Sequence, residues 1–249
     1  VRLRTLAVTS SSNKSSAGNF NGDVYVDAIT VTGENTTDTA GEADAFFAKD
    51  AGFTTLTLDT VSNSAATVTF DGTTAQTITG SILGAAAGDG AIAVTNTAGA
   101  VTFASALGAT KLGSVTLAAS TTTVFDSTLS SATLSASGAM TLKGAVTLTG
   151  VLTTGNGSTI TLGTAFKDGG ATAITAADST GGINQTGGAV TVNVSNQFTT
   201  GTVVLLENTD TLDANDLAAF TVTDTALVDY TAALATGTDT NSQVKITAA

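Results

Sequence analysis

The sequence predicts an all-β protein whose fold class is a parallel β-helix, or β-solenoid, with short capping helices. Three observations favour this class: apolar and hydroxyl residues alternate, one short phrase recurs, and glycine-containing pairs divide the alternating segments. Residues i and i+2 of a strand share a face, so the alternation buries Val and Leu while Thr faces outward. A β-sandwich is the alternative fold class, because short strands with frequent turns also build sandwiches.

The middle of the chain carries the strand signal. Thr is β-branched and favours an extended backbone even where it is exposed, so Thr-rich alternation predicts strands. The clearest alternating segments are Thr67–Phe70, Ser114–Leu117, Thr159–Leu162 and Thr191–Val194. The recurring phrase, Gly-Ala-apolar-Thr, occurs at Gly99–Phe103, Gly138–Leu142, Gly144–Leu148 and Gly188–Val192. Such repetition predicts that equivalent positions stack on one another.

Pairs of Asp or Asn with Gly separate these segments. They occur at Asp71-Gly72, Asp89-Gly90, Asn156-Gly157 and Asp168-Gly169. In a sandwich such pairs would form hairpin turns. The small, uniform interior residues and the absence of Trp from the sequence favour the solenoid, although the repeats follow no strict period.

The uneven distribution of charge divides the chain into three predicted regions. Acidic residues crowd into the two ends, whereas the middle is nearly neutral and repetitive. We therefore expect an acidic N-terminal segment with a short capping helix, a β-solenoid repeat region, and an acidic, β-rich C-terminal cap or joint. These regions are residues 1–52, 53–200 and 201–249.

Two short helices are expected beside the repetitive middle. Thr39 followed by Glu42 has the spacing of a capping box, Ala43–Ala48 would form the helix after it, Lys49 would lie in the last turn, and Gly52 would end it. Asp213 opens a similar segment that includes Leu217–Phe220. The end strands of a stacked sheet expose unpaired edges, so we expect these helices to cover the ends or to belong to a joint between subunits.

The composition excludes several classes of function. The 249 residues carry a net charge of −12 with only eight Lys and Arg, too few to neutralise a nucleic-acid backbone. The chain has no His and no Cys, which removes Ser-His-Asp and Cys-His catalysis and Cys/His zinc sites. We expect no enzyme activity and no catalytic residues. No apolar run reaches the length of about 18 residues that a transmembrane helix needs, so no transmembrane segment is expected.

An acidic stretch near the C-terminus is the best candidate metal site. Glu207, Asp210, Asp213 and Asp216 lie close together in the sequence. Calcium takes about 6–8 oxygen ligands, so these carboxylates are candidate calcium ligands, and calcium is the only cofactor that the sequence suggests. In the alternative interpretation, which the sequence favours, Asp213 caps a helix and the other side chains are solvated.

The first residues of the chain are a candidate assembly strand. Arg2, Leu3, Arg4, Leu6 and Val8 lie in an alternating segment. Such a strand can complete the sheet of a neighbouring subunit by donor-strand complementation. The alternative is an ordinary first strand of its own subunit, and the sequence does not distinguish the two.

Longer stretches resemble a known group of proteins. The stretches Thr67–Gly80, Gly88–Phe125 and Gly201–Leu234 are similar to repeats of large bacterial surface proteins. These are the β-solenoid passenger regions of autotransporters, of the rickettsial outer-membrane-protein-B type, and related surface-layer proteins of marine bacteria. The resemblance implies an extracellular location, a parallel β-helix and a structural or adhesive role.

Together these observations predict a self-assembling extracellular structural subunit, of a filament or a surface layer, whose main partner is itself. A heterologous contact that does not close builds such an open polymer. The alternative function is a monomeric adhesin or autotransporter passenger domain that binds surface glycans. Cell-envelope glycan or lipopolysaccharide is a candidate partner, and nucleic acid is not expected as one.

Overall fold

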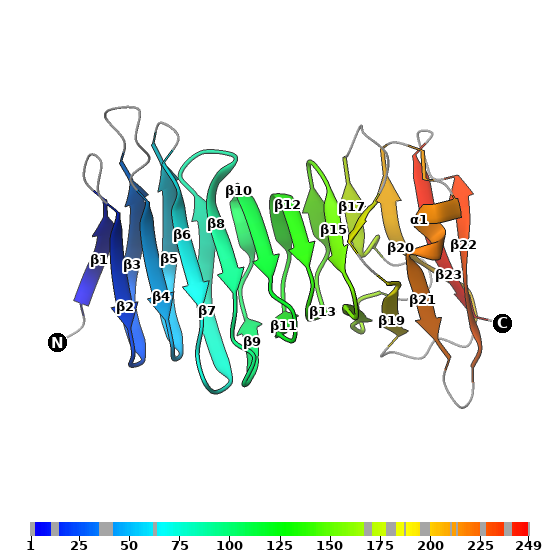
Figure 1. Cartoon of the computed structure of the whole chain (residues 1–249), viewed down its shortest axis with the longest axis horizontal. Coiled ribbons are helices and arrows are strands. Elements are labelled where there is room, and N and C mark those ends of the chain that lie inside the picture. The colour runs from blue at the N-terminus through cyan, green and yellow to red at the C-terminus, as the bar shows by residue number, and fades with distance from the viewer. Residues whose placement is uncertain are drawn as a thin grey trace.

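The protein is elongated, and its strands follow one another along the long axis (Figure 1). This structure is a computed structural model. Its described strands form one mixed sheet of 23 strands, which confirms the predicted all-β class. The residues that the structure describes are 3–10, 15–34, 42–61, 64–166, 171–177, 183–186, 188–194, 200–209, 211–212, 214–224, 228–236 and 241–248.

Consecutive strands do not form hairpins along most of the chain. β1, Leu3–Thr9, pairs in parallel with β3, Val24–Gly33. β2, Ser16–Phe20, pairs in parallel with β4, Ala43–Phe47. The alternative fold class, a sandwich of antiparallel sheets, does not match this pairing, because only β20–β23 and β22–β23 are antiparallel among the described strand pairs.

The alternation of the sequence accounts for the strands of the middle. Most of them bury every second side chain, as a period of two requires. The remaining strands are β5 (Ala51–Thr60), β6 (Ala66–Phe70), β7 (Gln76–Gly84), β8 (Asp89–Val94), β9 (Ala100–Phe103), β10 (Leu107–Leu117), β11 (Thr122–Phe125), β12 (Leu129–Ala136), β13 (Ala139–Leu142), β14 (Val146–Leu148), β15 (Leu152–Gly155), β16 (Thr159–Leu162), β17 (Ile174–Ala176), β18 (Ile183–Thr186), β19 (Val190–Val194), β20 (Thr202–Asn208), β21 (Phe220–Thr223), β22 (Tyr230–Thr236) and β23 (Ser242–Ala248).

Hydrogen bonding arranges these strands in three rows. The first row is β1-β3-β5-β7-β10-β12-β14-β17-β20-β23-β22. The second row is β2-β4-β6-β8-β10-β12-β15-β18. The third row is β7-β9-β11-β13-β16-β19-β21. Long strands such as β10 belong to two rows, and this joins the rows into one sheet.

The parallel pairing ends near the C-terminus. β23 pairs antiparallel with β20 on one side and antiparallel with β22 on the other. Two reversals restore the original direction, so β22 runs parallel to β20 and to the strands before it in the first row. The sequence did not predict these antiparallel pairs.

A column of aliphatic side chains runs through the first row. Its members follow one another by strand register: Leu6, Ile29, Leu56, Ile82, Leu107, Leu129, Val146, Ile174, Leu206, Val244 and Leu234. The spacing along the chain is uneven, since Leu129 and Val146 are 17 residues apart whereas Ile174 and Leu206 are 32 apart. Residues that occupy the same column position in successive strands are therefore separated by different numbers of residues in the sequence.

Phenylalanine rings form a second stack inside the molecule. Phe20 and Phe47 have ring centroids 4.9 Å apart, and Phe47 and Phe70 are 5.8 Å apart. Phe103 meets Phe70 edge-on at 5.2 Å and stacks on Phe125 at 5.6 Å. Such pairs contribute about 0.5–1.5 kcal/mol each beyond the apolar area that they bury.

The repeated phrase has a structural explanation in its glycine. A Cβ on Gly99 would collide with the backbone nitrogen of Ala75, and a Cβ on Gly138 would collide with the Thr121 hydroxyl oxygen. The strands that follow, β9 and β13, lie in the third row in matching register, because Ala100 and Ala139 both pair with Thr122 of β11. A Cβ on Gly144 would likewise collide with the Ser127 backbone, but that copy of the phrase precedes β14 of the first row. The phrase therefore marks a close approach of the chain before a strand and is not confined to one row.

A buried polar network holds the turn between β6 and β7. Gln76 Nε2 donates to the carbonyl oxygens of Phe47 at 2.7 Å and Lys49 at 3.1 Å. Gln76 Oε1 accepts from the Gly72 backbone nitrogen at 3.1 Å and from Asn96 Nδ2 at 2.9 Å. Gln76 and Asn96 are each 1% exposed, so these bonds satisfy amides that would otherwise be buried unpaired.

The expected helix over Ala43–Ala48 is wrong. Residues 43–47 form β4, which pairs with β2 and β6 on its two sides. Ala43, Ala45 and Phe47 are buried, and the Phe47 ring lies between those of Phe20 and Phe70. Two sheet neighbours and this stack outweigh a local helix preference of a few tenths of a kcal/mol per residue. Thr39 lies outside the described residues.

The second expected helix is confirmed in part. α1 spans Ala214–Ala218, and Phe220 already belongs to β21. Asp213 lies outside the described residues. The division of the chain at residues 52 and 200 stays a prediction, although β5 begins at Ala51 and continues the sheet across the first boundary.

Candidate functional site

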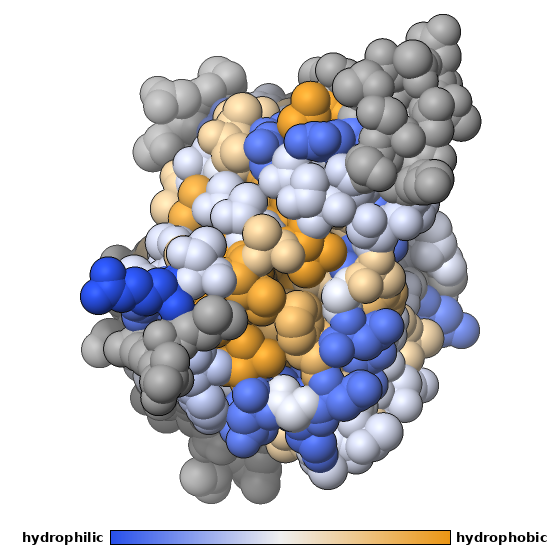
Figure 2. Space-filling view, turned by 90° about the vertical axis from the view of Figure 1, so that its left-hand side faces the viewer, coloured by the Kyte–Doolittle hydropathy of each residue, from blue (hydrophilic) through white to orange (hydrophobic). Residues whose placement is uncertain are grey.

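The N-terminal end of the molecule presents strand edges without a partner. β1 pairs only with β3, and β2 pairs only with β4, among the strands that the structure describes. Figure 2 shows this end, where apolar side chains gather in the centre and hydrophilic ones surround them. The interior of the sheet is therefore open here.

The apolar residues at this end are less buried than those of the middle. Leu6, Phe20 and Val24 are partly buried and pack against the core, whereas equivalent column residues such as Ile29 and Leu56 are fully buried. The difference arises because these residues have a neighbouring strand on one side only.

The C-terminal end carries a second edge. β22 is the outermost strand at the right of Figure 1 and has β23 as its ladder partner. Its residues, Tyr230–Thr236, include no charged side chain. Leu234 is 39% exposed, although its register partner Val244 is fully buried. Sheet edges are usually protected by charges, by Pro or by a covering segment. β22 has neither charges nor Pro, but α1 and β21 contact it, and the Tyr230 backbone nitrogen donates to Asp224 Oδ1 at 2.7 Å.

The structure places the candidate assembly strand in its own chain. Leu3, Leu6 and Val8 of β1 pair with Val26, Ile29 and Val31 of β3. Arg4 is exposed, and Arg2 lies outside the described residues. β1 is thus part of the sheet of its own chain, and no described strand pairs with its second edge. A role of this strand in assembly stays a prediction.

The candidate calcium ligands are only partly described. Asp210 and Asp213 lie outside the described residues. Glu207 lies on β20, and its carboxylate accepts hydrogen bonds from Gln243 at 2.8 Å, Asn241 at 2.9 Å and Thr172 at 3.4 Å. Asp216 lies on α1 and accepts from the Ile183 backbone nitrogen at 3.1 Å.

These contacts give the two described carboxylates structural roles. The Asn241 hydrogen bond is the largest influence on Glu207 and, with bonds from Gln243 and Thr172, holds the pKa of that carboxyl below its ordinary value despite partial burial. Asp216 binds the first residue of β18, which ends the second row. Among the described residues, no group of three or more acidic side chains is placed to hold a metal ion.

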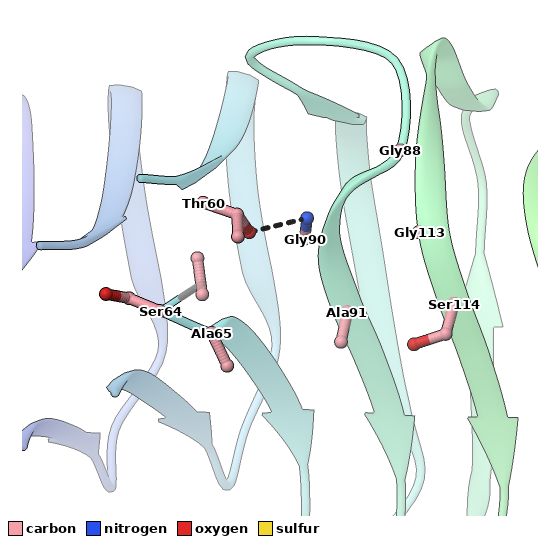
Figure 3. Close-up of a pocket in the computed structure, with 9 residues that line it drawn as sticks. Thr60, Ser64, Ala65, Gly88, Gly90, Ala91, Gly113 and Ser114 are labelled. Carbon is pink, nitrogen blue, oxygen red and sulfur yellow. Dashed lines mark hydrogen bonds between the residues drawn. The ribbon is translucent and has the colours of Figure 1, made fainter. Parts of the chain in front are cut away.

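A shallow pocket opens between strands of the N-terminal half (Figure 3). It encloses about 280 Å³ and is lined by small and hydroxyl residues from β5 to β10. Thr60 Oγ1 accepts a hydrogen bond from the Gly90 backbone nitrogen at 3.1 Å, which holds two sides of the pocket together. Neither a charged nor an aromatic residue is present in the lining: Thr60, Ser64, Ala65, Ala66, Gly88, Gly90, Ala91, Gly113 and Ser114.

The pocket has little capacity to bind a polar ligand. Ser64 Oγ is buried and has no hydrogen-bond partner in the described part of the chain. In Figure 3, however, this hydroxyl points away from Gly90 and Ser114, so it does not face the space between the strands. The lining lacks the aromatic side chains that usually stack on a glycan and the charged side chains that usually carry out catalysis.

Residues that sequence reasoning missed lie at the C-terminal edge. Leu234 was not a candidate, because its position at the end of the aliphatic column depends on the antiparallel pair of β22 with β23. The available signal was the uncharged alternation of Tyr230–Thr236 inside a region rich in acids.

Comparisons of the chain with family models, curated proteins and solved structures find no match. The edges left unpaired among the described strands make the two ends of the sheet the candidate functional surfaces, and this assignment rests on the structure alone. Within the described residues, no helix has the length and apolar character required to cross a membrane.

Proposed function

We propose that this protein is a self-assembling extracellular structural subunit, a component of a filament or a surface layer, and that its sheet is a β-solenoid. Support for the solenoid comes from the parallel registers of the three rows and from the continuous aliphatic column. In this fold each strand contacts only its neighbours, so the interior is exposed wherever the stack stops.

The observation that carries the proposal is the open N-terminal end. Apolar side chains occupy its centre, and two strand edges border it. An unprotected edge is a template for pairing with another chain. A polymer of this protein removes both features from water, and its long axis follows the axis of the stack.

The composition of the outer faces supports a structural role. Thr, Ser and Gly replace charged residues along the middle of the chain, and only 11% of all residues are charged. Weak charge repulsion permits close association of subunits. Calcium at the C-terminal acidic stretch and a glycan partner remain proposals of lower rank, because neither has a built site among the described residues.

Electron microscopy of the purified protein tests the proposal. We expect regular fibres or sheets to form as the protein concentration rises. Monodisperse particles at high concentration would contradict self-assembly and favour the monomeric adhesin. Repeating the experiment with a chelator tests calcium, since unchanged assembly and unchanged melting temperature would remove the calcium proposal.

A further inference from the structure

We infer that the joint between subunits is a parallel strand pair in which β22 of one copy binds β1 of the next, with Leu234 opposite Leu6. This inference rests on the proposed self-assembly and specifies its geometry. Its occupant is a second copy of this chain. Three independent features of the two ends support it: strand direction, register and charge.

Strand direction is the first feature. Every pair from β1 to β20 in the first row is parallel. β23 reverses the direction and β22 restores it. A β1 strand added alongside Leu234 and Ala235, at the edge of β22 that faces away from β23, forms another parallel pair when it has the same orientation, so the first row continues from one copy into the next.

Register is the second feature. The aliphatic column begins at Leu6, which is partly buried, and ends at Leu234, which is 39% exposed. Both leucines occupy the terminal position of the same column, and each has a column neighbour on one side only. Placing Leu234 against Leu6 gives each leucine its second neighbour and brings Ala235 opposite Ala7.

Charge is the third feature. The first nine residues contain the two arginines of the chain, Arg2 and Arg4, and no acid. Both terminal regions are acidic overall, but the charges beside the two joining strands differ, since Arg4 lies on β1 and Asp229 directly precedes β22. A β22–β1 contact brings these opposite charges near one another, whereas a β1–β1 contact would bring arginines together.

Cysteine cross-linking tests the register directly, since the natural chain has no Cys. Paired Cα atoms on adjacent strands lie about 5 Å apart, within the Cα separation of about 4.4–6.8 Å that a disulfide allows. We expect the double variant Ala7→Cys/Ala235→Cys to give a ladder of covalent oligomers on mild oxidation. Each single variant should give no ladder. A dimer formed efficiently by Ala7→Cys alone would indicate head-to-head contact and overturn the inference.

A charge placed on the column tests the same joint without cross-linking. Leu234→Asp should raise the protein concentration at which fibres appear by about tenfold or more, because a leucine contact is lost and a carboxylate is desolvated. Val61→Asp is the matched control: Val61 is 37% exposed and lies between β5 and β6, away from both ends. Equal effects of the two substitutions would contradict the inference.

The outcomes separate this inference from the proposed function. Fibres that form without cross-links between positions 7 and 235 would leave self-assembly standing and place the joint elsewhere. Absence of fibres and of cross-links at high concentration would contradict both proposals. Circular dichroism and melting temperature of each variant establish that the measured change is not a loss of folding.

Discussion

Two acidic side chains of the sheet differ in how their surroundings affect the ionised form. Glu207 on β20 accepts three side-chain hydrogen bonds, which lower its pKa below the ordinary value of 4.5. Asp44 on β4 is partly buried and lies near Glu42, and both influences raise its pKa above the ordinary value of 3.8. The two groups therefore affect stability with opposite sign.

Substitution of Glu207 by Gln should lower the melting temperature at neutral pH. The folded protein favours the ionised carboxyl, so its stabilising effect is present above pH 4.5 and is lost as the pH falls through the lowered folded pKa. Melting curves of the wild type and Glu207→Gln from pH 7 to pH 3 measure this, and the two curves should approach one another at the acid end.

Asp44→Asn supplies a control of opposite sign. Ionised Asp44 is destabilising, so this variant should melt at a higher temperature than the wild type at neutral pH. Its advantage should vanish below pH 3.8, where Asp44 is protonated in both the folded and the unfolded chain. A pH-independent change for both variants would show that the surroundings do not distinguish the ionised form.

Some residue-scale features could not be predicted from the sequence. Gln76 and Asn96 are polar residues beside turns, and a local pattern assigns such residues to the surface. Their partners come from other parts of the chain: Gln76 is 29 residues from Phe47 and 20 from Asn96. Only the stacking of the strands brings these groups together and buries them.

At the scale of single elements, strand β10 shows how a glycine permits close contact between neighbouring strands. Gly108 has φ +75°, and a Cβ there would collide with the carbonyl oxygen of Ser130 on the neighbouring β12. Gly157 has nearly the same φ, +77°, but has no atom within 4 Å of a Cβ position. The two glycines share backbone conformation and differ in the space around them.

This pair provides a stability test. Gly157→Ala should cost only the left-handed backbone strain of about 1–2 kcal/mol. Gly108→Ala should cost about 1–3 kcal/mol more, because β10 and β12 must separate to admit the methyl group. Chemical denaturation of both variants measures the difference, and equal losses would mean that the sheet relaxes around residue 108 without cost.

The elements differ in how well local sequence predicted them. Alternation identified β6, β16 and β19. One face of each strand is buried, so apolar residues recur at every second position of its sequence. It failed for β4, whose Ala-rich sequence also suits a helix and whose strand state depends on Phe20 and Phe70 in other strands. The reversal at β23 depends on pairing, which no local pattern specifies.

The stacked arrangement of the whole molecule predicts graded stability. Strands in the middle have a neighbour on each side, whereas β1, β2, β18, β21 and β22 have one ladder partner each among the described strands. Contacts link near neighbours in the stack, so opening of one end need not disturb the other.

Amide hydrogen exchange of the unassembled protein tests this grading. We expect exchange to be fastest in the strands with one ladder partner, β1, β2, β18, β21 and β22, and slowest in β7–β13, where each strand is held on both sides. Assembly should protect β1 and β22 selectively if the ends form the joint. Uniform protection along the chain would instead indicate that the whole sheet opens as one cooperative unit.

The placement of β23 between β20 and β22 has a consequence for biosynthesis. β20 is complete at Asn208, but its partner begins only at Ser242. At a translation rate of about 5–20 residues per second, the intervening chain takes a few seconds to emerge. During that interval the edge of β20 is accessible to other nascent chains, and a chaperone that shields it would act on this stretch.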